Sequence, residues 1–167
     1  MNVIIRLGSI AAVLTFCAWH ARAGESPASG LCTPAETAYF ACRSSRERWI
    51  SLCGQAPRTL QYRFGAMART ELRFPEDPAA GAASFALAHY FRFHTDRIEV
   101  AFRNQGVDYA IFDYKEDGKR RAGVRVTTVD GKETELVCSG RITSRLGKLE
   151  GIVRCDPDNA LNSGACR

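Results

Sequence analysis

The chain has 167 residues, of which 23 are basic, 18 are acidic and seven are cysteines, and its formal net charge is +5 at pH 7. This length suits one domain with a core of its own. Charges of both signs are mixed along the chain, so nothing in the composition requires nucleic acid as a partner.

Residues 1–23 have the pattern of an export signal. Arg6 precedes an apolar run over residues 7–19, and Ala21-Arg22-Ala23 forms a small-x-small cleavage pattern. The run is about a dozen residues long, whereas a membrane-spanning helix needs roughly 20. We therefore expect a signal peptide over residues 1–23, a flexible leader over residues 24–31, and a mature protein in the periplasm or outside the cell.

Cleavage after Ala23 would remove Cys17 and leave an even number of cysteines, as expected of an exported chain with disulfides. Phe16 has the wrong size for the position before a lipidated cysteine, so we do not expect a lipid anchor at Cys17. The cysteines expected to form disulfides are Cys32, Cys42, Cys53, Cys138, Cys155 and Cys166. No Cys-x-x-Cys pair exists, which argues against a metal site, and we expect no cofactor.

The spacing of these cysteines suggests pairs, although six cysteines allow 15 connectivities. Cys42 and Cys53 flank one expected hairpin and are the pair we favour. Cys138 and Cys155 flank a later break in the strand pattern. A bond between Cys32 and Cys166 would tie the two ends of the mature chain together.

The first expected element, over residues 33–40, has two interpretations. Thr33 is suited to the N-cap of a short helix, with Pro34 in its first turn and Glu36 three residues after the cap. Alternatively, the chain is extended here and continues into the first strand.

Most of the remaining chain alternates apolar and polar residues with the period of a half-buried strand. The expected strands are residues 49–53, 60–64, 70–74, 85–93, 98–103, 107–114, 122–126 and 133–138, of which the strand over residues 107–114 is more apolar. Turn signals separate them, including Asn104-Gln105-Gly106 and Asp130-Gly131, and residues 144–151 could form one short helical turn. We expect about eight or nine short strands in a single all-β, mainly antiparallel domain over residues 32–167, arranged as a disulfide-stabilised sandwich or open barrel with little helix.

The segments SLCG, LQYRFG and ELRFP, with VDYAIFDY and GVRV further along, resemble a family of small exported bacterial proteins that is uncharacterised. The resemblance covers most of the mature chain. It implies a location in the bacterial envelope or outside the cell, and it carries no catalytic residue onto this sequence.

Few residues suggest catalysis. The mature chain contains His89, in a row of apolar side chains, and His94, beside Asp96. Either histidine with a carboxylate could serve a small hydrolase. The sequence has no Gly-x-Ser-x-Gly, His-Glu-x-x-His or phosphate-binding glycine motif. A protein that binds rather than catalyses is the leading hypothesis.

The candidate binding surface consists of arginines in the outward-facing phase of the expected strands, together with one tyrosine. Its members are Arg63, Arg73, Tyr90, Arg92, Arg103 and Arg125. Arginine and tyrosine are enriched at protein interfaces. The hypothesis is a non-enzymatic binding protein, such as an inhibitor or immunity protein directed against an envelope-attacking enzyme, with a protein partner. The alternative is a structural envelope protein that binds anionic lipid or cell wall through the same arginines.

Overall fold

A computed structural model describes residues 29–162 and Cys166. The expected signal peptide and Cys17 lie outside the described residues, as does the expected leader up to residue 28. Gly30 is buried, and the amide of Leu31 donates a hydrogen bond to Ser51 Oγ at 3.0 Å. The last residues of the expected leader therefore contact the folded part of the chain.

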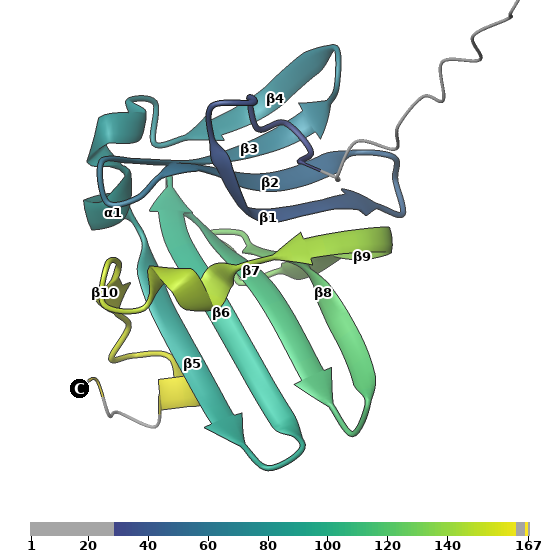
Figure 1. The fold of residues 1–167 in the computed structure, drawn as a ribbon, viewed down its shortest axis with the longest axis vertical. Coiled ribbons are helices and arrows are strands. Elements are labelled where there is room, and N and C mark those ends of the chain that lie inside the picture. The colour runs from purple at the N-terminus through teal and green to yellow at the C-terminus, as the bar shows by residue number, and fades with distance from the viewer. Residues whose placement is uncertain (1–28, 163–165, 167) are drawn as a thin grey trace, which may run out of the picture.

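The described chain forms ten strands and four short helical segments (Figure 1). The strands are β1 (Thr37–Ser44), β2 (Trp49–Gln55), β3 (Thr59–Ala66), β4 (Arg69–Phe74), β5 (Ala86–Arg92), β6 (Thr95–Asn104), β7 (Val107–Glu116), β8 (Lys119–Thr127), β9 (Glu133–Ser144) and β10 (Arg154–Cys155). The helical segments are η1 (Pro78–Ala80), α1 (Gly81–Ser84), η2 (Leu146–Leu149) and η3 (Ala160–Asn162).

All ten strands belong to one curled sheet in the order β10-β5-β6-β7-β8-β9-β1-β2-β3-β4. Neighbouring strands are antiparallel except for β10 and β5, which are parallel. The expected all-β, mainly antiparallel open barrel is confirmed. The expected short helical turn after the last long strand is also present, as η2.

Tight turns join the long strands of the β5–β8 region. Gln105 and Gly106, with φ of 50° and 82°, connect β6 to β7, and Asp117 and Gly118, with φ of 46° and 76°, connect β7 to β8. Two successive residues with positive φ give a turn whose twist matches that of the flanking strands. The two hairpins β5–β6 and β7–β8 lie side by side and extend away from β1–β4 (Figure 1).

The long strand β9 joins the two halves of the curled sheet. Its first part pairs with β8, and its second part pairs with β1, with a register shift in that pairing between Cys42 and Arg43 of β1. The inner faces of the two halves pack together through aromatic side chains. Phe74 of β4 stacks on Phe102 of β6 at 4.5 Å between ring centroids, and Phe102 stacks on Tyr109 of β7 at 4.7 Å. The opposite face of β5–β8 is called the outer face below.

Residues 33–36 form a turn, and residues 37–44 are strand, so the extended interpretation of this segment is correct. The contacts of a capping box are nevertheless present, because Glu36 Oε2 accepts hydrogen bonds from the amide and the hydroxyl of Thr33. The Glu36 carboxylate also receives Arg63 of β3, at 2.7 Å to each oxygen. This side-chain contact holds the segment against the sheet and favours the turn over a helix.

All six cysteines that we expected to form disulfides do so, but the prediction that Cys42 pairs with Cys53 was wrong. The bonds are Cys32–Cys53, Cys42–Cys138 and Cys155–Cys166. In the β1–β2 hairpin, Cys42 lies opposite Ile50 and Cys53 lies opposite Ala38. The two cysteines are thus at opposite ends of the hairpin, about 10 Å or more apart at the rise of a strand, too far for a bond. The proposed tie between Cys32 and Cys166 is also absent, and Cys138 does not pair with Cys155.

Candidate binding surface

The outer face of β5–β8 contains a row of alanines directly opposite one another. Ala86 of β5 pairs with Ala101 of β6, and Ala101 pairs with Ala110 of β7. Each alanine has an aromatic neighbour in the sequence whose side chain points to the inner face, because successive side chains of a strand point to opposite faces. Because these three side chains are only methyl groups, the surface of the sheet is depressed across three strands.

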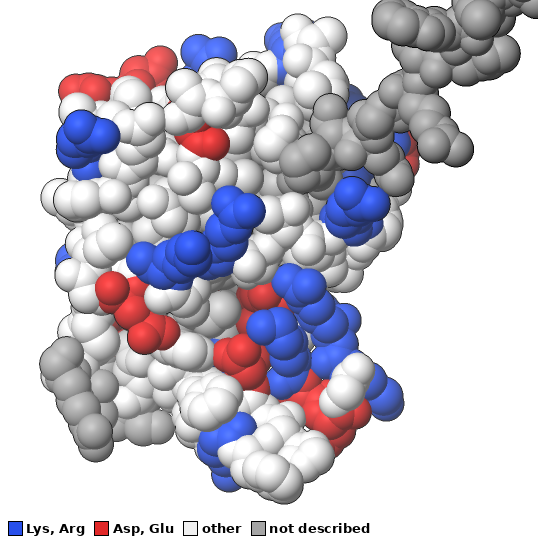
Figure 2. All heavy atoms as spheres, in the orientation of Figure 1, with Lys and Arg blue, Asp and Glu red and all other residues white. Residues whose placement is uncertain are grey.

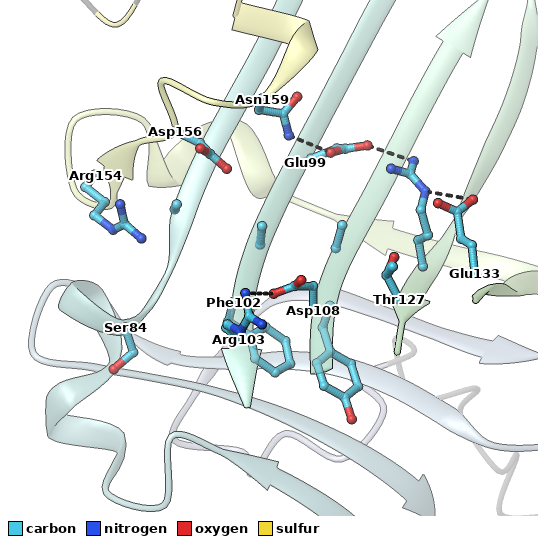
Figure 3. A pocket seen from close by; sticks show the side chains of 15 residues that line it. Ser84, Glu99, Phe102, Arg103, Asp108, Thr127, Glu133, Arg154, Asp156 and Asn159 are labelled. Carbon is cyan, nitrogen blue, oxygen red and sulfur yellow. Dashed lines mark hydrogen bonds and ion pairs between the residues drawn. The ribbon is translucent and has the colours of Figure 1, made fainter. Parts of the chain in front are cut away.

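Charged and polar side chains border this row on both sides (Figure 3). The next row outward contains Arg103, Asp108 and Thr127, paired in register across β6, β7 and β8. Arg103 Nη1 lies 3.6 Å from Asp108 Oδ1. The row on the other side contains Glu99. The resulting cavity has a volume of about 440 Å³, which lies within the range of small ligand sites. We call it the alanine trough.

The C-terminal segment forms one end of the alanine trough. Arg154, Asp156 and Asn159 line it there, and Glu133 of β9 lines the other end (Figure 3). The Cys155–Cys166 disulfide closes the segment into a loop. Asn162 fastens that loop to β5, because its Oδ1 accepts the amide of His89 at 3.2 Å.

A buried carboxylate supports the wall of the trough. Glu99 is almost fully buried, and its oxygens accept hydrogen bonds from Arg125 Nη2 at 2.9 Å, from Asn159 Nδ2 at 2.8 Å and from the hydroxyl of Tyr114. A buried carboxylate is tolerated when it is paired and hydrogen-bonded in this way. Burial, together with the hydrogen bond to Glu99, raises the pKa of Tyr114 to about 12. The network holds β6, β7, β8 and the C-terminal loop in fixed positions.

Beyond this network, arginines lie over aromatic rings along the outer face. Arg92 lies 5.5 Å from the ring centre of Tyr90, and Arg97 lies 5.7 Å from that of Tyr114. Arg121 lies 5.4 Å from the ring centre of Phe112. Contacts of this kind hold the flat guanidinium groups against the sheet.

The structure divides the predicted arginines between two regions. Arg63 and Arg73 lie opposite each other on β3 and β4. Arg63 is mostly buried and bound to Glu36, so it does not contribute an outward-facing charge. Arg92, Arg103 and Arg125 lie on the outer face of β5–β8, together with Tyr90.

The sequence reasoning missed Arg97, Arg121, Arg154 and the row of alanines. Ala86 and Ala88, and Ala101 in the next strand, occupy the phase opposite to the large apolar residues. Small side chains repeated at every second position were a signal that could have indicated a depression. The contribution of Arg154 had no comparable signal, because it depends on where the C-terminal loop lies.

The two histidines occupy different environments. Both ring nitrogens of His89 contact carboxylates, with Nε2 at 2.8 Å from Asp96 Oδ1 and Nδ1 against Glu150. Burial alone would raise the pKa of Asp96, but hydrogen bonds from His89 and Lys115 outweigh this effect and the pKa is lowered. His94 lies in the β5–β6 turn with φ of 62°, beside Phe93. The structure does not bring the two histidines into one site with the alanine trough.

Two kinds of feature are absent from residues 29–162 and 166. No group of three or more histidine, cysteine, aspartate or glutamate residues in this range could hold a metal ion. No helix in the same range has the length and apolar character needed to cross a membrane.

Comparisons with known proteins found no matching family model, no matching curated protein and no matching solved structure.

Proposed function

We propose that this protein is an exported, non-enzymatic binding protein that holds a segment of a partner polypeptide in the alanine trough. The observation that carries the proposal is the in-register row of Ala86, Ala101 and Ala110, bordered by charged side chains of both signs. A polypeptide segment offers backbone groups and side chains of both charges, which matches such a lining. The methyl floor lets the segment approach the sheet closely.

The lining favours a polypeptide over a sugar. Sugar rings are commonly bound against the face of an exposed aromatic ring. Phe102 and Tyr109 are the two aromatic residues among the described lining residues, and they stack on each other with an interplanar angle of 1° in the inner-face aromatic cluster. The described side chains of the trough thus offer hydrogen bonds and charge rather than an exposed ring for stacking.

The residues near the trough support binding rather than hydrolysis. Ser84 lines the cavity, but its hydroxyl donates a hydrogen bond to the carbonyl of Ala80 at 2.8 Å. A serine nucleophile needs a base in contact with that hydroxyl. His89, the candidate base, has both nitrogens against Asp96 and Glu150.

Three disulfides are typical of proteins in an oxidising compartment. In the periplasm or outside the cell, a small cross-linked sheet that holds a polypeptide segment suits an inhibitor or an immunity protein. We propose an envelope-attacking enzyme as the partner class, since such an enzyme acts in the same compartment.

The experiment compares capture of protein by two tryptophan variants. Ala101→Trp fills the trough from its floor, and Met67→Trp places the same ring at the exposed β3–β4 turn. Oxidised wild-type protein and both variants are immobilised and exposed to envelope and secreted extracts, and bound proteins are identified by mass spectrometry. We expect one saturable protein that is bound by the wild type and by Met67→Trp and is lost by Ala101→Trp. Equal capture by all three would contradict the proposal.

A further inference from the structure

The β5–β6 turn lies at the end of the molecule farthest from β1–β4 (Figure 1), with Phe91 near the end of β5 and Phe93 in the turn itself. Phe91 is 74% exposed and Phe93 is 89% exposed. Large apolar side chains exposed together on a turn contribute nothing to the core and mark an interaction surface. Arg92 lies between them in the sequence and is exposed as well.

The neighbouring β7–β8 turn lies beside these rings. The amide of Asp117 donates a hydrogen bond to the carbonyl of His94 at 3.0 Å, which joins the two turns. Phe91, Phe93, Lys115 and Gly118 line one shallow depression between them. We call this surface, formed by residues 91–95 and 115–119, the hairpin tip.

The hairpin tip keeps two basic side chains and one acidic side chain, Asp117, that have no ion-pair partner within the described part of the chain, which leaves a small excess of positive charge. Glu116 forms an ion pair with Arg97, and Asp96 pairs with Lys115 and His89. Arg92 and Lys119 lie in the same cross-strand row, and neither has an ion-pair partner within the described part of the chain. Figure 2 shows uncharged atoms at this end of the molecule, with both basic and acidic side chains beside them.

We infer that the hairpin tip binds an anionic phospholipid surface, with Phe91 and Phe93 inserted among the headgroups. Phenylalanine is among the apolar residues that membrane-surface segments bury at the boundary between headgroups and acyl chains. Arg92 and Lys119 lie where phosphate groups would surround the inserted rings, and basic residues near an anionic leaflet strengthen binding. The combination of apolar insertion and positive charge is the one that stable reversible membrane binding uses.

A membrane fits this surface better than a protein cleft. Both rings are largely exposed and lie at the end of two neighbouring hairpins, so they can enter a flat surface without any concave partner. The alanine trough lies farther along β6–β8, toward the β6–β7 turn at the opposite end of these strands. It therefore remains open when the hairpin tip faces a membrane.

The test measures co-sedimentation of the oxidised protein with vesicles of phosphatidylethanolamine containing 30% phosphatidylglycerol, and with vesicles of phosphatidylcholine alone. We expect binding to the anionic vesicles only. Phe91→Ser/Phe93→Ser should weaken it at least tenfold with no change of charge. Met67→Ser/Val129→Ser, which removes two equally exposed apolar side chains elsewhere, should bind as the wild type does.

A second pair of measurements separates charge from insertion. Arg92→Gln/Lys119→Gln should weaken binding by roughly fivefold per charge removed, and high salt should weaken the wild type in the same direction. Ala101→Trp should bind vesicles normally, so failure of the trough proposal leaves this inference intact. No binding of the wild type to anionic vesicles, or equal binding by Phe91→Ser/Phe93→Ser, would overturn the inference. Capture of a protein that needs Phe91 and Phe93 in the absence of vesicle binding would also overturn it.

Discussion

Glu99 and Arg125 form an ion pair on the outer face of the sheet, with 2.9 Å between Oε1 and Nη2 and side chains that are 5% and 24% exposed. The pair lies beside the alanine trough and connects β6 to β8. Arg125 also lies near Glu133 and Glu135, so one guanidinium neutralises several carboxylates. Loss of that guanidinium would leave the most buried of them uncompensated.

We expect Arg125→Met to lower the free energy of unfolding by about 3 kcal/mol, because breaking a buried ion pair leaves a charge without its partner. Arg121→Met is the matched control, since Arg121 pairs with Glu135 at an exposed position. That substitution should cost less than about 1 kcal/mol. Urea unfolding of the oxidised proteins gives both values, and similar costs for the two would refute the importance of the Glu99 pair.

The ion pair between Glu36 and Arg63 should make stability depend on pH in acid. Burial alone would raise the pKa of Glu36, but hydrogen bonds from Arg63 and Thr33 outweigh it and the pKa is lowered below 4.5. A lowered pKa in the folded state gives stability that is present above the unfolded pKa and is lost as pH falls through the folded value. We expect Glu36→Gln to flatten the decline in unfolding free energy below pH 4.5. An unchanged decline in this variant would show that other carboxyl groups cause it.

The disulfides should differ in their effect on stability. Cys42–Cys138 closes a loop with a sequence separation of 96 and joins β1 to β9, whereas Cys155–Cys166 spans 11. In the chain-entropy account, loops of these sizes correspond to about 4.7 and 3 kcal/mol. Cys42→Ala/Cys138→Ala should therefore lower the melting temperature more than Cys155→Ala/Cys166→Ala does. Peptide mass mapping of the native protein must also recover both bonds, and a Cys42–Cys53 peptide would contradict the structure.

Close approach of β8 and β9 predicts an effect of a single methyl group. A Cβ atom at Gly123 would lie 2.2 Å from the carbonyl oxygen of Leu136, while one at Gly147 would meet no atom within 4 Å. We expect Gly123→Ala to cost about 1–3 kcal/mol, since the strands must move apart to accommodate it. Gly147→Ala should leave the melting temperature nearly unchanged. Equal melting temperatures for the two variants would show that the strands separate without cost.

The all-β fold could be predicted because alternation of apolar and polar residues is a local property of each strand. Leu60, Tyr62 and Leu52, for example, are all buried, as their phase indicates. The disulfide pairing could not be predicted in the same way. Cys42 and Cys138 become neighbours only because β9 pairs with β1, which is a consequence of strand order.

The predicted arginine surface shows the same distinction. The outward phase of Arg92 and Arg103 was evident from the alternation, and both are exposed. Arg63 has the same local pattern, but residues 29–36 lie against β2 and β3 and bring Glu36 to its guanidinium. Phase predicts the face on which a side chain lies, whereas only tertiary structure decides what covers that face.

Photo-crosslinking from the rim of the alanine trough tests the central proposal most directly. A benzophenone amino acid is placed at Arg103, on the wall of the trough, and at Met67 as the matched exposed control. The oxidised proteins are irradiated in envelope extract. We predict one discrete protein adduct from position 103 that disappears when Ala101→Trp is added, and no such adduct from position 67. No adduct from position 103, or the same adducts from both positions, would contradict a binding site in the trough.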